Sequence, residues 1–157
     1  MTAVTALKSL LENKIFLSTV FSLCIAQILK MVLYLFFNRN KNKRIAIETM
    51  IWHTGGMPSS HSAIVCSLVT SAGIYEGIDS NFFILCLVFA MVVLRDSMGV
   101  RRAAGLQAKA LNILGKQYAK LTGEEFSSVK EIQGHTPLEV LVGAFLGILI
   151  AICFYLI

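Results

Sequence analysis

The sequence predicts an all-α integral membrane protein: a single domain over residues 1–157 with a bundle of about four transmembrane helices, a cytoplasmic helical extension and a loop. Composition supports this class, because the chain is 56% hydrophobic and 15% charged with a mean hydropathy of +0.73. Soluble domains are nearer 45–50% apolar and about 25% charged. Four long apolar segments and an uneven spread of basic residues support it further. With so many spans, any chemistry must be built from the spans and their loops.

The four apolar segments each approach the roughly 20 residues that a helix needs to cross a bilayer. The first, 15–37, is too long for a secretory signal peptide and lacks a small-residue cleavage site after it. The second, 59–75, follows Pro58, which suits the first turn of a helix. The third, 81–100, ends in charged residues. The fourth, 137–157, starts at a Thr-Pro-Leu-Glu capping box.

The basic residues predict the orientation in the membrane, because Lys and Arg in short loops mark the cytoplasmic side. Four basic residues separate the first two segments and six follow the third, whereas the link 76–80 has two acidic residues and no basic one. Lys8 and Lys14 oppose this bias only weakly. We expect a cytoplasmic-membrane protein with both termini outside. Topology accounts for the net charge of +5, so no nucleic-acid partner is expected.

The four cysteines occur singly within apolar runs, so they are interpreted as small core residues rather than metal ligands. They are Cys24, Cys66, Cys86 and Cys153. No cluster of carboxylates or cysteines suggests a metal site, and no cofactor is expected.

The third helix is expected to continue past the bilayer surface to about Asn112. Its small residues Gly99, Ala103 and Ala104 predict close packing on a neighbouring helix. The stretch 116–134 is polar and without a strong period, which indicates a helix end followed by a surface loop.

The sequence Gly-Gly-Met-Pro-Ser-Ser-His-Ser-Ala, residues 55–63, is the most informative local feature. Its glycines allow close backbone approach to a ligand, and its serines suit a helix cap. The N–H groups and dipole of the following helix favour an anion there, and His61 could exchange a proton with it. The alternative is an ordinary loop-to-helix junction.

Ionisable residues inside spans are costly and are therefore functional candidates. Lys30 lies in the first span on the same helical face as Gln27; the alternative is a lysine that snorkels to the headgroups. Arg95 and Asp96 come near the end of the third span, where neighbours in sequence do not face each other, so each needs a partner elsewhere. A structural ion pair, or anchoring of Arg101 and Arg102 in anionic lipid, are the alternatives.

His135 precedes the fourth helix and Glu139 lies four residues later. The carboxylate could accept a hydrogen bond from one ring nitrogen of His135 and hold the other ready to attack. It could instead complete the capping box with Thr136. Spacing does not decide between these two roles. His53, in the first cytoplasmic loop, has no matching carboxylate and is interpreted as incidental.

Under the predicted topology, several charged and titratable residues meet at the cytoplasmic ends of the spans. Two histidines, several cations and two helix N-termini at one membrane face describe a phosphate site. The residues that converge are Lys30, Arg44, His61, Asp96, Arg101, His135 and Glu139.

From about Gln27 to Gly147 the chain resembles a divergent branch of the type 2 phosphatidic acid phosphatase superfamily, which is related to the vanadium-dependent haloperoxidases. Besides residues 55–63, the resemblance rests on Arg-Asp-Ser-Met-Gly-Val-Arg-Arg-Ala-Ala-Gly-Leu-Gln-Ala and on Gly-His-Thr-Pro-Leu-Glu-Val-Leu-Val-Gly-Ala-Phe-Leu-Gly. It implies an all-helical membrane phosphatase without a metal.

The resemblance also implies roles for particular residues. A Pro-Ser-Gly-His motif that binds phosphate and protonates the leaving group corresponds to Pro58–His61, with Ser60 in place of glycine. In a Ser-Arg-x5-His-x3-Asp motif, His135 matches the nucleophile and Glu139 its carboxylate, while Val129 replaces the arginine. The first motif of the superfamily, Lys-x6-Arg-Pro, is not present as such, and Lys30 and Arg44 are the candidates to replace it. The implied phosphate-binding residues are Lys30, Arg44, Ser59, Ser60, Asp96, Arg101, Arg102 and Lys130.

The function that follows is hydrolysis of a lipid phosphate or pyrophosphate through a phosphohistidine, with the bilayer and a phosphate-carrying lipid as partners. The departures at Ser60 and Val129 and the missing Lys-x6-Arg-Pro motif keep a second function open, that of a membrane scaffold or lipid-binding protein that retains the phosphatase fold without activity.

Overall fold

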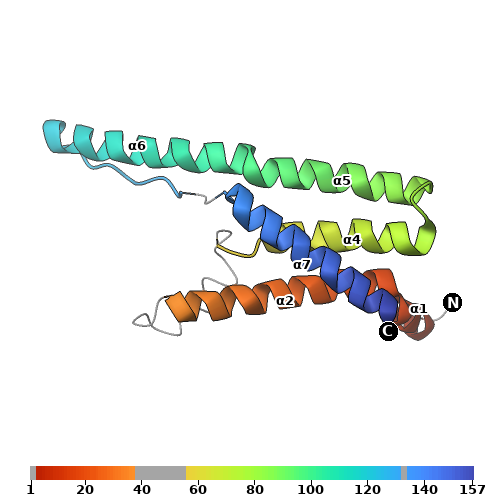
Figure 1. Ribbon diagram of the computed structural model, residues 1–157. Coiled ribbons are helices and arrows are strands. Elements are labelled where there is room, and N and C mark those ends of the chain that lie inside the picture. The colour runs from red at the N-terminus through yellow and green to blue at the C-terminus, as the bar shows by residue number, and fades with distance from the viewer. Residues whose placement is uncertain (1–2, 38–55, 132–133) are drawn as a thin grey trace.

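The computed structural model describes residues 3–37, 56–131 and 134–157 (Figure 1). Within these ranges the regular secondary structure is all helix, with no strand, which confirms the all-α class. Arg44 and His53 lie outside the described residues. The helices are α1 (Ala3–Glu12), α2 (Lys14–Phe37), α4 (Ser60–Glu76), α5 (Asn81–Met98), α6 (Val100–Thr122) and α7 (Pro137–Leu156).

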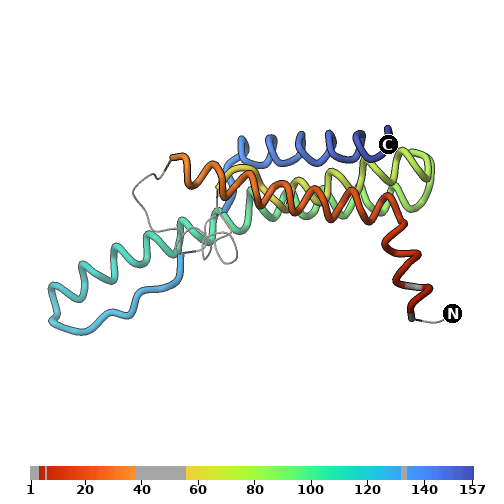
Figure 2. Tube along the Cα trace, turned by 90° about the horizontal axis from the view of Figure 1, so that it is seen from below, coloured from red at the N-terminus to blue at the C-terminus, as the bar shows by residue number. Residues whose placement is uncertain are grey.

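Helices α2, α4, α5 and α7 form a bundle in which α4 contacts the other three (Figures 1 and 2). The outer surface of the bundle is apolar: Leu85 of α5 and Phe145 of α7 are 66% and 64% exposed. The buried positions are mostly alanines and serines. Large apolar side chains outside and small ones inside is the pattern of helices packed in lipid, where close backbone approach replaces a hydrophobic core.

The closest packing joins α4 to α7. A Cβ added at Gly143 would collide with the backbone carbonyl of Ser59, and one at Gly147 with that of Ala63. This Gly-x-x-x-Gly spacing places both glycines on one face of α7 and lets the two backbones touch. The contact brings the N-terminal ends of α4 and α7 together.

The contact between α2 and α4 is polar. The hydroxyls of Ser18 and Ser71, both fully buried, lie 2.7 Å apart. Such a hydrogen bond satisfies two groups that could find no water within a bilayer.

Three helical stretches are long and apolar enough to cross a membrane: Lys14–Phe37, Asn81–Thr122 and Pro137–Leu156. The stretch from Asn81 includes both α5 and α6, whose backbone hydrogen bonding continues through Gly99. Helix α4 has 17 residues. The structure therefore supports a membrane protein with three candidate spans, and the count of four remains a prediction.

Helix α6 extends beyond the bundle, as the sequence predicts (Figure 1). It ends at Gly123, whose left-handed backbone (φ 76°) caps the helix. The following chain returns along α6: the Asn112 amide donates to the Val129 carbonyl at 2.8 Å and to Glu131, and Phe126 lies against Gly115. Gly99, Ala103 and Ala104 are exposed, so, contrary to the prediction, they pack on no other helix within the described part of this chain. Helix contact uses Gly143 and Gly147 instead.

Helix α1 was not anticipated from the sequence. It is separated from α2 by Asn13, whose side chain accepts a hydrogen bond from the Phe16 backbone N–H at 3.0 Å and so starts α2. The apolar residues Val4, Leu7 and Leu11 of α1 are all more than half exposed. This helix lies at the end of the bundle opposite to α6 (Figure 2).

Candidate active site

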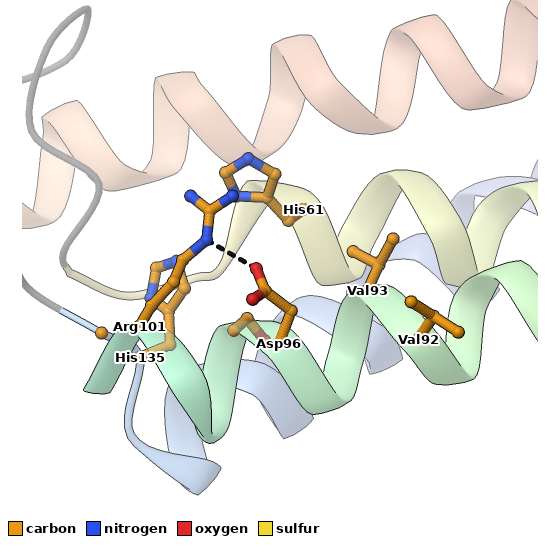
Figure 3. A pocket seen from close by; sticks show the side chains of 8 residues that line it. His61, Val92, Val93, Asp96, Arg101 and His135 are labelled. Atoms are coloured by element: carbon orange, nitrogen blue, oxygen red, sulfur yellow. Dashed lines mark hydrogen bonds and ion pairs between the residues drawn. The ribbon is translucent and has the colours of Figure 1, made fainter. Parts of the chain in front are cut away.

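A pocket of about 260 Å³ lies where the C-terminal end of α5 meets the N-terminal ends of α4 and α7 (Figure 3). It combines two imidazoles, one ion pair and an apolar wall. Its lining residues are His61, Val92, Val93, Asp96, Ser97, Arg101, Gly134 and His135.

His135 is held from two sides. Its backbone N–H donates to the Ser97 carbonyl of α5 at 3.2 Å. Its ring Nδ1 lies 2.9 Å from Glu139 Oε2, one turn into α7. Gly134 allows this approach, because a Cβ there would collide with the backbone of Arg102. With 4% of its surface exposed, His135 has one defined orientation.

Glu139 fills both roles that the sequence left open. The oxygen that meets the His135 ring also accepts the Thr136 backbone N–H at 3.2 Å, while Thr136 Oγ1 accepts the Glu139 backbone N–H at 3.4 Å. One carboxylate oxygen has lone pairs for two donors. The helix cap and the orientation of the histidine are therefore made by the same atom.

Glu139 also links the two sequence motifs. Its backbone carbonyl accepts the N–H of Ser59 at 3.0 Å. Ser59 is fully buried and caps α4, with its Oγ accepting from the Ser62 N–H at 3.4 Å. Ser60 is buried beside it. The hydroxyl of Ser59 is thus engaged in the cap, and neither serine lines the pocket; His61 is the α4 residue that does.

His61 stands in this first turn and faces His135, with ring centroids 6.3 Å apart and planes inclined by 57° (Figure 3). At this separation the rings do not bond to each other, and both can contact one anion placed between them. His61 is the more exposed of the two. The arrangement suits one fixed imidazole and one that exchanges protons with solvent.

Arg101 and Asp96 form the ion pair of the pocket, with Arg101 Nε 2.6 Å from Asp96 Oδ2 (Figure 3). Residues five apart do not share a face of a regular helix. Gly99 departs from helical geometry between them (φ −99°, ψ −86°). Asp96 thereby finds the partner that the sequence required, and the guanidinium is turned toward the histidines.

Lys30 reaches the same end of the bundle from α2. It is 8% exposed, and its Cε lies 3.2 Å from where a Cβ of Gly56 would be. Its positive charge attracts the Glu139 carboxylate and repels a positive charge on His61. Burial against the Gly56 turn differs from the exposed headgroup position of a snorkelling lysine. Gly56 has a φ of 99°, a conformation that favours glycine.

Two further predicted phosphate ligands, Arg102 and Lys130, do not line the pocket. Arg102 is exposed and contributes its backbone, against Gly134. Lys130 is exposed next to Val129, whose backbone pairs with Asn112 at 2.8 Å. Asn112 lies eleven residues beyond Arg101, about 16 Å along α6. Of the two candidates for the arginine that is missing at Val129, Arg101 thus lines the pocket and Lys130 does not.

Sequence reasoning missed the supports of the site. The Ser97 carbonyl, Gly134 and the apolar wall of Val92 and Val93 carry no chemical signature of their own. The one sequence signal that could have identified Gly134 as part of the site was its position next to His135. Among the described residues, no three His, Cys, Asp or Glu side chains come together as a metal site needs; chemistry without a cofactor stays a prediction.

Comparison with known proteins agrees with the motifs. The model of the divergent PAP2 family matches residues 11–150. The chain belongs to this family. It is also 34% identical over 154 residues to the uncharacterized membrane protein YuiD of Bacillus subtilis (strain 168), covering 91% of this chain and 94% of that protein. No solved structure matches the chain. The resemblance to the PAP2 superfamily and the membrane class are thereby confirmed.

Proposed function

We propose that this divergent PAP2 protein hydrolyses a lipid phosphate or pyrophosphate without a metal. The observation that carries the proposal is the pair of imidazoles on opposite sides of the pocket, with His135 Nδ1 held by Glu139 at 2.9 Å and the rings 6.3 Å apart. A nucleophile fixed by a carboxylate, opposite a proton donor, is the arrangement that covalent phosphoryl transfer requires.

The proposed chemistry has two steps. Because Glu139 binds the Nδ1 side of His135, Nε2 is unprotonated and attacks phosphorus. The P–N bond forms, the P–O bond to the leaving group breaks, and protonated His61 gives its proton to the leaving oxygen. Neutral His61 then takes a proton from water, whose oxygen attacks phosphorus. The P–N bond breaks, which releases phosphate and restores His135.

Positive charge around the pocket supports a phosphoryl group there. Arg101 lines the pocket, Lys30 acts on His61 from α2, and the N-terminal turn of α4 points its N–H groups to the same end of the bundle. Donors in place before the reaction stabilise the charge that develops on the phosphoryl oxygens. Asp96 orients Arg101 rather than binding the anion itself.

A lipid substrate is favoured by position. The pocket lies at the end of helices that are apolar enough to cross a membrane, and Val92 and Val93, one turn before Asp96 on α5, give it an apolar wall. A headgroup phosphate at this level would leave its hydrocarbon chains in the bilayer.

The distribution of Lys and Arg favours the cytoplasmic leaflet. With the native cysteines replaced, Ser127→Cys should resist membrane-impermeant thiol reagents in intact cells, whereas Asp79→Cys should react. The reverse labelling pattern would place the site on the outer face.

The deciding experiment is an assay of the purified protein in detergent with phosphatidic acid, phosphatidylglycerophosphate, isoprenyl phosphates and isoprenyl pyrophosphates, in the presence of EDTA. We expect phosphate release that vanadate inhibits and that His135→Ala and His61→Ala each abolish. Both variants should keep the elution volume and thermal midpoint of the parent. Turnover at the parental rate by either variant would contradict this mechanism. Binding of these lipids with no turnover by the parent protein would favour the scaffold function instead.

A further inference from the structure

Helix α6 carries a seam of apolar residues that the candidate active site does not use. Seven positions follow one another in alternating steps of four and three residues, the spacing of a coiled-coil core. Six of them are apolar, and glutamine occupies the other. They are Val100, Ala104, Gln107, Leu111, Leu114, Tyr118 and Leu121.

This seam is uncovered within the part of the chain that the structure describes. Leu114 is 63% exposed and Leu121 is 87% exposed. The chain that returns along α6 is held through Asn112, and its Phe126 covers Gly115 at one flank of the seam. At 100° per residue, Lys109 and Lys116 fall on the face opposite the seam. Helix α6 thus has one apolar and one basic face.

Lipid cannot cover most of the seam. Backbone hydrogen bonds run through Gly99, so α5 and α6 form one helical stretch of 42 residues. At 1.5 Å per residue this stretch is about 63 Å long, against a hydrocarbon core of about 30 Å. Roughly half of this stretch must therefore extend past the bilayer. That half is α6, which projects beyond the bundle (Figure 1).

We propose that the seam of α6 pairs with the same seam of a second copy of this chain. All copies share one orientation in a membrane, so a two-fold axis along the membrane normal sets the two seams parallel and at the same height. Leu111 would then meet Leu111 of the other copy, and Leu114 would meet Leu114.

The flanks of the seam permit this self-association. Beyond Arg101 they carry no charge, so two copies do not repel each other along the contact. On the side that Phe126 does not cover, mostly small side chains let the helices come close. These flanking residues are Ala103, Ala110 and Gln117 on one side and Ala108, Gly115 and Thr122 on the other.

Disulfide cross-linking in isolated membranes tests the proposal. In protein freed of its four native cysteines, Leu114→Cys should give a covalent dimer on oxidation with copper–phenanthroline. Lys116→Cys, two residues away on the opposite face, is the matched control. We expect at least tenfold more dimer from Leu114→Cys. Equal yields at the two positions, or no dimer from Leu114→Cys while the thiol reacts freely with maleimide, would overturn the proposal.

Two further measurements separate the alternatives. Leu111→Glu with Leu114→Glu should halve the mass of the detergent-solubilised protein in light scattering, whereas Lys109→Glu with Lys116→Glu should leave it dimeric. All four side chains are exposed, so neither variant disturbs the bundle. A fluorophore on Leu114→Cys that spin-labelled lipids quench would show a membrane-bound α6, and would overturn the pairing of two copies.

Discussion

The junction of α4 with α7 and the extension formed by α6 both carry residues that the sequence marks as functional, but they are built differently. At the junction, backbone meets backbone: the Ser59 N–H donates to the Glu139 carbonyl at 3.0 Å, and Gly143 lies against Ser59. In the extension and the chain that returns along it, Arg102 and Lys130 end in exposed side chains.

The difference shows where positional accuracy in this protein comes from. His135 is 4% exposed and bonded through both its backbone and its ring, so little motion is left to lose when a ligand binds. Ordering a free lysine or arginine side chain costs up to about 2 kcal/mol of rotamer entropy. Groups that must meet a phosphorus atom in line are therefore expected at the junction, while the basic face of α6 suits less specific attraction.

Gly143→Val is the substitution with the largest expected effect on this comparison. The added side chain would strike the backbone carbonyl of Ser59, which cannot rotate away as a side chain would. Overpacking costs about 1–3 kcal/mol and sometimes more, and we expect a loss at or above the upper value. The thermal midpoint in detergent measures it.

Phe145→Val is the matched control, because Phe145 lies on the same helix and is 64% exposed. It should leave the midpoint of the parent protein nearly unchanged. A Gly143→Val protein as stable as this control would show that α4 and α7 can move apart without cost, and that their close backbone contact does not position Glu139.

The parts of the site that the sequence predicts are those set by local spacing. His135 and Glu139 are one helical turn apart, so their contact follows once α7 starts at Pro137. His61 and Lys30 fall at the correct end of the bundle because the apolar segments around them are long and bounded. Alternation of direction between successive spans then brings these ends together.

Features that depend on the path between elements could not be predicted. Val129 is held by Asn112, seventeen residues earlier, and this bond carries Lys130 away from the pocket. The packing of Gly143 on Ser59 needs the partner helix to be known, although the Gly-x-x-x-Gly spacing was available as a signal. The amphipathic α1 was overlooked because it precedes the first long apolar run.

Arg101 and Arg102 give the sharpest test, since they are adjacent, identical residues of α6 and only Arg101 reaches the pocket at the junction. Arg101 faces the histidines and pairs with Asp96 at 2.6 Å, whereas Arg102 is exposed and outside the pocket lining. If Arg101 neutralises the transferring phosphoryl group, Arg101→Ala should lower the rate of phosphate release by about 10²–10³. Arg102→Ala should stay within about threefold of the parent, because it keeps the backbone that contacts Gly134 and removes only an exposed charge. Rates are compared on the lipid that the assay identifies, with the thermal midpoints of both variants as the check on folding. Equal losses from the two substitutions would mean that the basic surface as a whole attracts the substrate and that Arg101 has no special place in the reaction.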